Sequence, residues 1–347
     1  MLEESQEPLS STYDLVMADL DGVVYVGPAA VPGAPEHLAE ARRRGVHVAF
    51  VTNNASRTPR MVAEHLCELG VAAEASDVVT SAQAAAHLLA GRLEPGAPVL
   101  LLGGAGLEEA LLDEGLTPVL DAADGPAAVV TGYGPDVTWR RLMTGAMLIR
   151  DGLPWVASNT DLTFPTAEGV APGHGVQVRM LSDFSGVTPE VAGKPARPLL
   201  DETVRRVGGD RPLMVGDRLD TDIEGARVAG VDSLLVLTGV TGLAELVAAP
   251  PRLRPRFLAA DLGGLFTAHP VPHVAAGSTT AELGGWRAEV RGGVLAVDGA
   301  GDPDDWWRAV AYAAWGHLDE TGEVCDTSGV EPPTPVGPPA VGGTVTA

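Results

Sequence analysis

Short apolar runs that alternate with helical segments are the feature of this sequence that most constrains its fold. Residues 14–18 belong to such a run and contain no turn former, which is typical of a fully buried strand, and residues 46–54 form a second strand. Segments 35–45 and 59–69 have helical spacing and end at or before a glycine. This order of strand, helix, strand and helix predicts an α/β fold with a doubly wound parallel sheet.

The alternation is interrupted by a second unit and then resumes. Strands are expected at 97–104, 126–134 and 153–159, with helices at 106–115 and 138–149. Residues 211–239 then return to the pattern of strand, loop, helix and strand. We therefore expect a core domain that contains an inserted α/β domain. The expected divisions are 1–80 for the first part of the core, 81–188 for the insertion and 189–270 for the second part of the core.

The sequence changes in character after about residue 270. Residues 286–299 alternate around two glycines and predict a hairpin, and 302–320 predict a helix capped by Asp302. We expect 271–325 to form a small α+β module, and four of the six tryptophans fall within it. Tryptophans exposed there would indicate an interface, such as a homodimer contact. The tail 326–347, rich in Pro, Gly and Thr, is expected to be disordered.

Composition excludes some classes of partner. The chain has 347 residues, and 46 acidic against 23 basic side chains give a net charge of −23, which would repel nucleic acid and anionic lipid. Its first dozen residues lack the pattern of a signal peptide, and no apolar run reaches membrane-spanning length. Cys67 and Cys325 lie far apart without metal-ligand spacing. These features favour a cytoplasmic protein with reduced thiols.

An acid pair follows the first strand. Asp19 and Asp21 come directly after it, and Gly22 permits a sharp turn. Ligands bind at the carboxyl ends of strands in open parallel sheets. Two neighbouring carboxylates repel each other unless a cation or an unusual protonation state separates them. Taken alone, the pair is equally compatible with a solvated acidic turn.

Three further polar motifs lie at the ends of predicted strands or at their edge. They are Thr52-Asn53-Asn54, Gly193-Lys194-Pro195, and Gly216-Asp217 with Asp222. Together with the acid pair they suit phosphoryl transfer, because carboxylates hold Mg²⁺ and one carboxylate can attack phosphorus. Hydroxyl, amide and ammonium groups then bind the charged phosphoryl oxygens.

Each motif alone also has an ordinary explanation. Thr52 and Asn53 are compatible with side-chain capping of a turn. Lys194 before a proline is compatible with an exposed loop, and Asp222 with a first-turn acid favoured by the helix dipole. Only the combination of motifs makes phosphoryl transfer the favoured interpretation.

The set DLDG, TNN, GKP and GDRLDTD resembles the four signatures of the haloacid dehalogenase (HAD) superfamily. Their order, with an insertion after the second motif, resembles the NagD-type branch, which carries a large α/β cap. The resemblance covers about residues 13–265. It implies a phosphatase with Mg²⁺ as its cofactor, built on a HAD core with an inserted cap.

The resemblance also implies roles for individual residues. Asp19 would be the nucleophile, and Asp21 the general acid and later the general base, with its backbone carbonyl on the metal. The implied metal ligands are Asp19, Asp21, Asp217 and Asp222. The implied substrate-binding residues are Thr52, Asn53, Asn54 and Lys194, joined by Asn159 and His174 from the cap.

The resemblance narrows the substrate to a small phosphomonoester. The C-terminal module makes the chain similar to the actinobacterial branch, whose members resemble glycerol 3-phosphate phosphatases and whose extension resembles a remnant of an acetyltransferase. Residues 271–325 are too short for a complete acetyltransferase. A broad phosphatase for phosphoglycolate, sugar phosphates or pyridoxal phosphate is the alternative within the same chemistry. A phospho-receiver and a non-catalytic scaffold are the alternatives of other classes.

One other motif competes for a functional assignment. Residues 100–110 imitate a dinucleotide-binding loop, with Gly104 and Gly106 between a strand and a helix. Glu109 occupies the place of the third glycine, which disfavours that function. His47, His65 and His87 lie in or beside periodic segments and are expected to be packing or surface residues.

Overall fold

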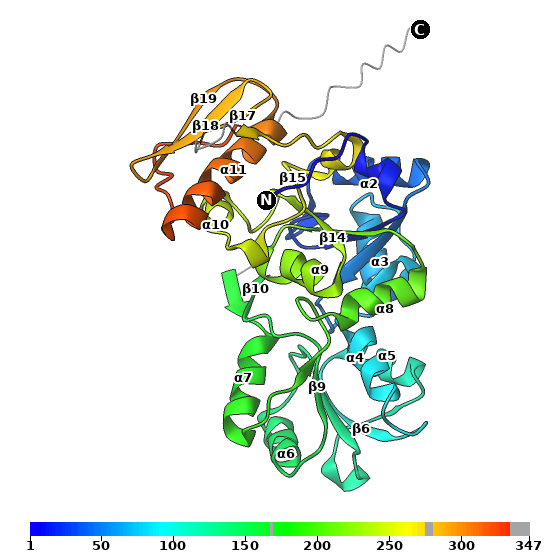
Figure 1. Ribbon diagram of the computed structural model, residues 1–347. Coiled ribbons are helices and arrows are strands. Elements are labelled where there is room, and N and C mark those ends of the chain that lie inside the picture. Colours follow the sequence, from blue (N-terminus) through cyan, green and yellow to red (C-terminus); the bar gives the residue numbers. More distant parts are fainter. Residues whose placement is uncertain (167–168, 275–279, 334–347) are drawn as a thin grey trace, which may run out of the picture.

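A six-stranded parallel sheet forms the core of the protein (Figure 1). The computed structural model describes residues 1–166, 169–274 and 280–333. In spatial order the strands are β15 (Phe257–Ala259), β14 (Asp232–Val236), β13 (Pro212–Gly216), β1 (Leu15–Ala18), β4 (His47–Thr52) and β5 (Val78–Thr80). All neighbouring pairs are parallel, so strands from both ends of the insertion share one sheet, as the sequence predicts.

Helices cover both faces of this sheet. Apolar side chains of β1, β4 and β13 alternate between the two faces, because successive residues of a strand point in opposite directions. On one face Val16 and Phe50 pack with α2 (Ala34–Arg43) and α3 (Pro59–Glu68). On the other face Met17 and Val51 pack with α4 (Ser81–Ala90), α8 (Pro198–Val207) and α9 (Glu224–Ala229). The predicted doubly wound α/β architecture is confirmed.

A second, five-stranded parallel sheet builds the inserted cap, at the lower end of the molecule in Figure 1. Its strands in spatial order are β12 (Glu190–Val191), β9 (Trp155–Ala157), β8 (Ala128–Thr131), β6 (Pro98–Leu102) and β7 (Thr117–Val119). Its helices are α5 (Ala105–Asp113), α6 (Trp139–Arg150) and α7 (His174–Ser185), and a hairpin of β10 (Thr163–Thr166) and β11 (Gly169–Pro172) precedes α7. β12 pairs with β9, so this sheet runs past residue 188.

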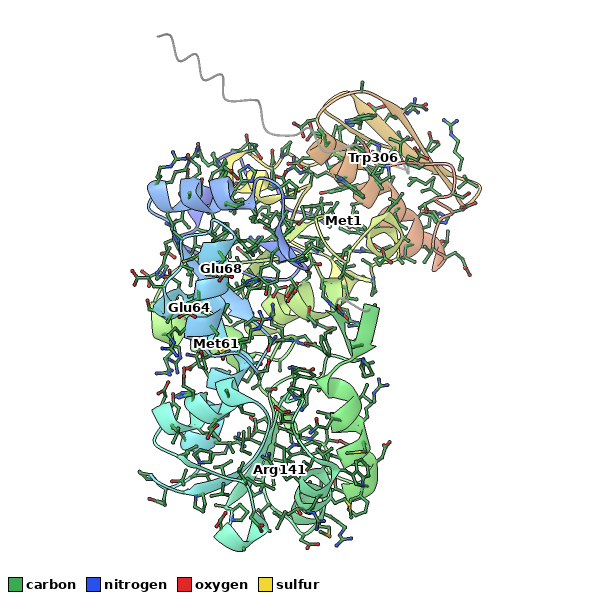
Figure 2. The ribbon with its side chains drawn as sticks, turned by 180° about the vertical axis from the view of Figure 1, so that it is seen from behind. Met1, Met61, Glu64, Glu68, Arg141 and Trp306 are labelled. Atoms are coloured by element: carbon green, nitrogen blue, oxygen red, sulfur yellow. The ribbon has the colours of Figure 1, made fainter. Side chains whose placement is uncertain are left out.

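The C-terminal module contains a four-stranded sheet and one long helix. The strands are β16 (His273–Val274), β17 (Ala281–Leu283), β18 (Trp286–Arg291) and β19 (Val294–Gly299), and the helix is α11 (Pro303–Thr321). Asp302 caps this helix as expected, since its side chain accepts a hydrogen bond from the backbone of Asp304. Figure 2 shows Trp306 in this module and Arg141 in the cap at opposite ends of the molecule.

Three of the four tryptophans of this module face its interior, and Trp286 is only partly buried. Trp306, Trp307 and Trp315 are all less than 10% exposed and share an apolar cluster with Leu235 and Leu258 of the core sheet. They therefore give no support to an exposed aromatic interface. The folded part of the chain also extends past residue 325, because the Asp326 N–H donates to the Gly293 carbonyl and the Asp326 carbonyl accepts from the Leu295 N–H. Residues 334–347 of the expected disordered tail lie outside the described residues.

The remaining short elements connect these layers. They include α1 (Leu9–Thr12), β2 (Tyr25–Val26), β3 (Ala29–Ala30) and α10 (Leu243–Val247). Within the described residues, none of the helices combines the length and the apolar character needed to cross a membrane.

Candidate active site

The predicted motifs meet at one edge of the core sheet. β13, β1 and β4 are adjacent and parallel, and Ala18 at the end of β1 lies opposite Val215 and Phe50. Asp19 and Asp217 therefore leave the sheet side by side, next to Thr52. The Asp19 N–H donates to the Val215 carbonyl at 2.8 Å, which fixes the nucleophile candidate to the neighbouring strand.

Lys194 links two of the acids. Its side chain is only 2% exposed, and its Nζ lies 2.6 Å from Oδ1 of Asp19 and 2.7 Å from Oδ1 of Asp222. Burial alone would lower the pKa of Lys194, but the two carboxylates outweigh it and raise the pKa above its ordinary value. The lysine thus stays charged and holds Asp19 in a fixed position. Asp222, implied as a metal ligand, is thus also a partner of Lys194.

Three buried carboxylates form a candidate metal centre. One carboxylate oxygen from each of Asp19, Asp217 and Asp222 lies within 4.8 Å of the other two. The buried Oδ1 of Asp217 has no hydrogen-bond partner among the described residues. Burial, and then the neighbouring Asp222, raise the pKa of Asp217 to about 7. Three carboxylates against one ammonium leave buried negative charge, so this all-oxygen donor set fits a divalent cation such as Mg²⁺.

Glycines give these carboxylates their space. A Cβ on Gly22 would lie 2.3 Å from Oδ2 of Asp217, and one on Gly239 would lie 2.0 Å from the same atom. Gly22 also has a positive φ of +83°, which side chains rarely adopt. Next to Gly239, the Val240 N–H donates to Oδ2 of Asp217 at 2.5 Å. Sequence reasoning missed Gly239, although it follows β14 at the same sheet edge.

Asp21 lies beside this cluster rather than within it. The turn that carries it is closed by a hydrogen bond from the Gly22 N–H to the Tyr25 carbonyl at 2.8 Å. The side chain is accessible to solvent, yet the surrounding protein desolvates the carboxyl and raises the pKa of Asp21, against the opposing charge of Lys194. A raised pKa suits a group that must deliver a proton. The expected metal contact through its backbone carbonyl stays a prediction.

Thr52 and Asn54 both take part in turn capping. The buried Thr52 accepts a hydrogen bond on Oγ1 from the Asn54 N–H at 3.0 Å. The Asn54 side chain accepts from the Ser56 N–H at 2.9 Å and from its hydroxyl at 2.8 Å. The ordinary explanation of this motif therefore holds for part of it, and phosphoryl binding by these two residues stays a prediction.

Asn53 instead contacts Lys194. Its Oδ1 accepts from the Lys194 N–H at 2.8 Å, and its Nδ2 donates to the Lys194 carbonyl at 3.0 Å. The side chain that was expected to bind phosphate thus holds the backbone of the site lysine.

The two cap candidates are buried between the cap and the core. Nδ2 of Asn159 donates to the Asn53 carbonyl at 2.7 Å, and Nδ1 of His174 lies 2.9 Å from the Asn159 carbonyl. Both side chains are less than 5% exposed. Burial lowers the pKa of His174 to about 4, so the ring is neutral near pH 7. His174 is the first residue of helix α7, and substrate contact by either residue stays a prediction.

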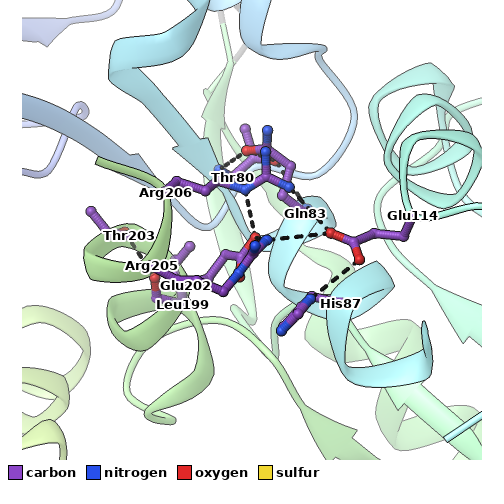
Figure 3. A network of polar contacts seen from close by, with 9 residues as sticks. All are labelled: Thr80, Gln83, His87, Glu114, Leu199, Glu202, Thr203, Arg205 and Arg206. Atoms are coloured by element: carbon purple, nitrogen blue, oxygen red, sulfur yellow. Dashed lines mark hydrogen bonds and ion pairs between the residues drawn. The ribbon is translucent and has the colours of Figure 1, made fainter. Parts of the chain in front are cut away.

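A second cluster of possible metal ligands is an ion-pair network (Figure 3). His87 of α4, Glu114 after α5 and Glu202 of α8 converge there. Glu202 accepts hydrogen bonds from Arg205 at 2.7 Å and from Arg206 at 2.5 Å, and both arginines also lie within 3.5 Å of Glu114. The guanidinium groups already balance these acids, so the cluster joins cap and core helices and has no need of a cation.

The glycine-rich loop at 100–110 serves packing. A Cβ on Gly106 would lie 2.3 Å from the Arg57 carbonyl, and one on Gly104 would lie 3.2 Å from the Ser56 backbone. The Gly106 N–H donates to the Ser56 carbonyl at 3.1 Å. These glycines therefore let α5 approach the core loop after β4, and this contact explains their presence without a dinucleotide.

Comparison with known proteins places these features in a family. The model for haloacid dehalogenase-like hydrolases matches residues 16–117, and the HAD-hydrolase-like model matches residues 191–265. The chain is 45% identical to the D-glycerol 3-phosphate phosphatase of Mycobacterium tuberculosis, over 88% of this chain and 87% of the relative. A 5'-nucleotidase of Bacillus subtilis is 37% identical over 66% of this chain and 89% of its own length.

A solved structure extends this similarity to three dimensions. The crystal structure of glycerol phosphate phosphatase from Mycobacterium tuberculosis in complex with magnesium matches with a TM-score of 0.81 and 44% identity. The match covers 90% of this chain and 93% of the other. The motifs, the capped fold and the relatives agree: the chain belongs to the haloacid dehalogenase-like hydrolase family.

Proposed function

We propose that this protein is a Mg²⁺-dependent phosphatase that hydrolyses glycerol 3-phosphate to glycerol and inorganic phosphate. The observation that carries the chemistry is the buried nucleophile candidate Asp19, bound to Lys194 and surrounded by Asp217 and Asp222. The observation that supports the substrate is the similarity, over nearly the whole length of both chains, to the phosphatase of Mycobacterium tuberculosis named for that ester.

In the first step, Asp19 attacks the phosphorus atom of the ester. Lys194 occupies Oδ1 of Asp19, which leaves the other carboxylate oxygen to form the new bond. The bond from phosphorus to the ester oxygen breaks, and the leaving alkoxide takes a proton from Asp21. The raised pKa of Asp21 keeps that proton available. The products are the alcohol and an aspartyl-phosphate on Asp19.

In the second step, water attacks the aspartyl-phosphate. Asp21, now ionised, accepts a proton from that water, phosphate leaves, and the Asp19 carboxylate is restored. Lys194 remains between Asp19 and Asp222 and offsets negative charge throughout. Asp19, Asp217 and Asp222 would hold Mg²⁺, which supplies positive charge against the phosphoryl oxygens when bound.

The structure favours turnover over the other functional classes. A phospho-receiver also uses acids, a Thr and a Lys around a phosphorylatable Asp, but it needs neither a cap nor an acid placed to protonate a leaving group. Here Asp21 lies two residues from Asp19, and a complete α/β cap adjoins the site through Asn159. A scaffold would not require a buried lysine between two acids, an arrangement that costs desolvation energy.

A panel of small phosphomonoesters tests the proposed substrate. Initial rates with Mg²⁺ should give the highest kcat/KM for glycerol 3-phosphate among both glycerol phosphate isomers, phosphoglycolate, sugar phosphates, pyridoxal phosphate and a nucleoside 5'-monophosphate. A higher kcat/KM for another ester would reject the glycerol assignment and leave the phosphatase assignment intact. No hydrolysis of any ester, including p-nitrophenyl phosphate, would reject both.

The proposal also places the protein in the cytoplasm. Cys67 and Cys325 are free thiols, which suits the reducing cytoplasm. A homodimer stays a prediction, and Trp306, Trp307 and Trp315 are too deeply buried to form its surface.

A further inference from the structure

Asn53 is a junction between the catalytic edge and the cap. Its side chain makes two hydrogen bonds to the Lys194 backbone. Its backbone carbonyl accepts a hydrogen bond from the Ser81 hydroxyl at 2.6 Å and one from the Asn159 side-chain amide at 2.7 Å. Ser81 begins α4, in the segment where the chain leaves the core for the cap, and Lys194 follows β12, in the segment where it returns to the core. Asn53 therefore contacts both connections between core and cap, and also the cap itself.

Asp161 of the cap completes this junction. Nδ2 of Asn53 lies 3.2 Å from each carboxylate oxygen of Asp161. The backbone of Asp161 is itself held, because its N–H donates to Oδ1 of Asn159 at 3.2 Å and its carbonyl accepts from the Gly175 N–H at 2.8 Å. The carboxylate thus meets Asn53 from a fixed cap loop.

The Asp161 carboxylate reinforces the orientation of the Asn53 amide that the Lys194 backbone also requires. An ionised carboxylate only accepts hydrogen bonds, so it selects the orientation in which the amide nitrogen faces Asp161. Oδ1 of Asn53 then faces the Lys194 N–H. With the opposite orientation, an N–H of Asn53 would face the N–H of Lys194, and two donors would meet.

The space around this junction leaves little freedom. A Cβ on Gly193 would lie 2.6 Å from Oδ1 of Asn53 and 2.6 Å from the Ser158 carbonyl. The chain before Lys194 is therefore pressed between Asn53 and the cap strand end. A change in the Asn53 amide would be passed to Lys194, whose Nζ holds Asp19.

We propose that Asp161 is a positioning residue for catalysis, which acts through Asn53 and Lys194 to hold the nucleophile Asp19. The inference rests on the proposed phosphatase activity but not on the identity of the alcohol. Lys194 and Asp19 act on every ester, so loss of Asp161 should slow all esters by the same factor. A residue that touches the leaving group would instead affect one ester more than another.

The test compares Asp161→Ala and Asp161→Asn on two esters with unlike leaving groups, glycerol 3-phosphate and p-nitrophenyl phosphate, with Mg²⁺ saturating. Asp161→Ala should lower kcat on both by an equal factor of roughly 10 to 100, with KM within about twofold, because displaced catalytic groups cost that much. Asp161→Asn keeps an acceptor oxygen and should recover most of that loss. Asp183→Ala, which removes an exposed carboxylate from α7 of the cap, should match the wild type.

Unequal losses on the two esters, a large rise in KM, or unchanged kcat in Asp161→Ala would overturn the positioning role. A second measurement does not depend on turnover. The thermal midpoints of Asp161→Ala, Asn53→Ala and the double variant form a cycle, and the double variant should be no less stable than Asn53→Ala alone. Additive losses would contradict the coupling even if the proposed substrate proved wrong.

Discussion

Asp19 and Lys194 form a buried ion pair in which each group depends on the other. Asp19→Asn keeps the shape of the side chain, and its amide oxygen can still accept from Nζ of Lys194. The amide cannot attack phosphorus, so we expect turnover to fall at least about 1000-fold while the fold is retained. Hydrolysis of p-nitrophenyl phosphate and the circular dichroism spectrum measure both effects. Activity retained in a folded Asp19→Asn protein would reject Asp19 as the nucleophile.

Gly239 offers a test of the candidate metal centre that leaves every carboxylate in place. A Cβ there would lie 2.0 Å from Oδ2 of Asp217, so Gly239→Ala must displace the carboxylate or the loop. We expect the Mg²⁺ concentration for half-maximal activity to rise about tenfold or more, since ligand geometry controls Mg²⁺ affinity. Titration of activity with Mg²⁺ measures this.

Gly316→Ala is the matched control for that substitution. Gly316 lies inside α11, and a Cβ there meets no atom within 4 Å. Its replacement should leave the Mg²⁺ dependence unchanged and raise stability by about 0.5–1 kcal/mol, because alanine favours the helix. An unchanged Mg²⁺ dependence in Gly239→Ala as well would argue against Asp217 as a ligand.

The sequence was sufficient to predict which acids would converge, but not how they are held. Asp19 and Asp217 could be predicted because strand ends in a parallel sheet share one edge, whereas Lys194, which follows a strand of the cap sheet, was predicted from its motif. The roles of Gly239 and Asp161 depend on loops far apart in the chain that approach to within bonding distance, and no local pattern encodes that approach. The Asn53 side chain shows the same limit, because its motif predicted phosphate binding and its geometry shows contacts with Lys194.

At the level of elements, helix α8 contributes a buried acid to the boundary between cap and core (Figure 3). Burial raises the pKa of Glu202, but hydrogen bonds from Arg205 and Arg206 outweigh it and hold the pKa below its ordinary 4.5. Because the pKa of Glu202 is lower in the folded state, its ion pairs stabilise the folded protein above pH 4.5. This stabilisation is lost as the pH falls through the folded-state pKa of Glu202.

Glu202→Gln should therefore destabilise the protein in a pH-dependent way. Near pH 7 we expect a loss of about 1–2 kcal/mol, allowing for solvent screening of the partly exposed arginines. The difference from the wild type should shrink below pH 4.5, as thermal midpoints across pH would show. Glu64→Gln, at an exposed site on α3 (Figure 2), should change stability by less than about 0.5 kcal/mol at any pH. A pH-independent loss in Glu202→Gln would contradict the ion-pair account.

Elements with a clear hydrophobic pattern could be predicted from the sequence, and elements that depend on tertiary contacts could not. The strands at 15–18 and 47–52 and the helix at 303–321 closely match their expected positions. Helix α4 was not predicted, although Thr80 and Gln83 form a capping box that marks its start. The hairpin of β10 and β11 lacks a strong alternation, and it forms where the cap loop turns back toward α7.

At the scale of the whole molecule, the C-terminal module shares its apolar interior with the catalytic core. The cluster that contains Trp315 also contains Leu219 and Ile223, which flank the acidic segment that ends at Asp222. The module thus packs behind the loop that carries two candidate metal ligands. This arrangement explains how an appended segment can matter to a phosphatase without contributing a catalytic group.

Trp315→Ala tests this supporting role. Trp315 is fully buried, its Nε1 donates to the Leu246 carbonyl at 2.7 Å, and the Arg254 guanidinium lies 5.1 Å from the centre of its ring. Its removal should cost about 3–5 kcal/mol, the usual loss for a large buried aromatic side chain. At 25 °C kcat/KM should stay near the wild-type value, and on heating, activity should fall together with the lowered thermal midpoint.

Trp139→Ala provides the comparison, because Trp139 is 64% exposed on α6 of the cap and its loss should barely move the midpoint. If Trp315→Ala instead lowers kcat at 25 °C while the protein remains fully folded, the module shapes the active site directly. If the midpoint does not change, the packing of α11 against the core contributes nothing to stability. Only a lowered midpoint with an intact catalytic rate fits a module that stabilises the core from behind, because the tryptophan touches the core at α10 rather than at the edge where β1 ends.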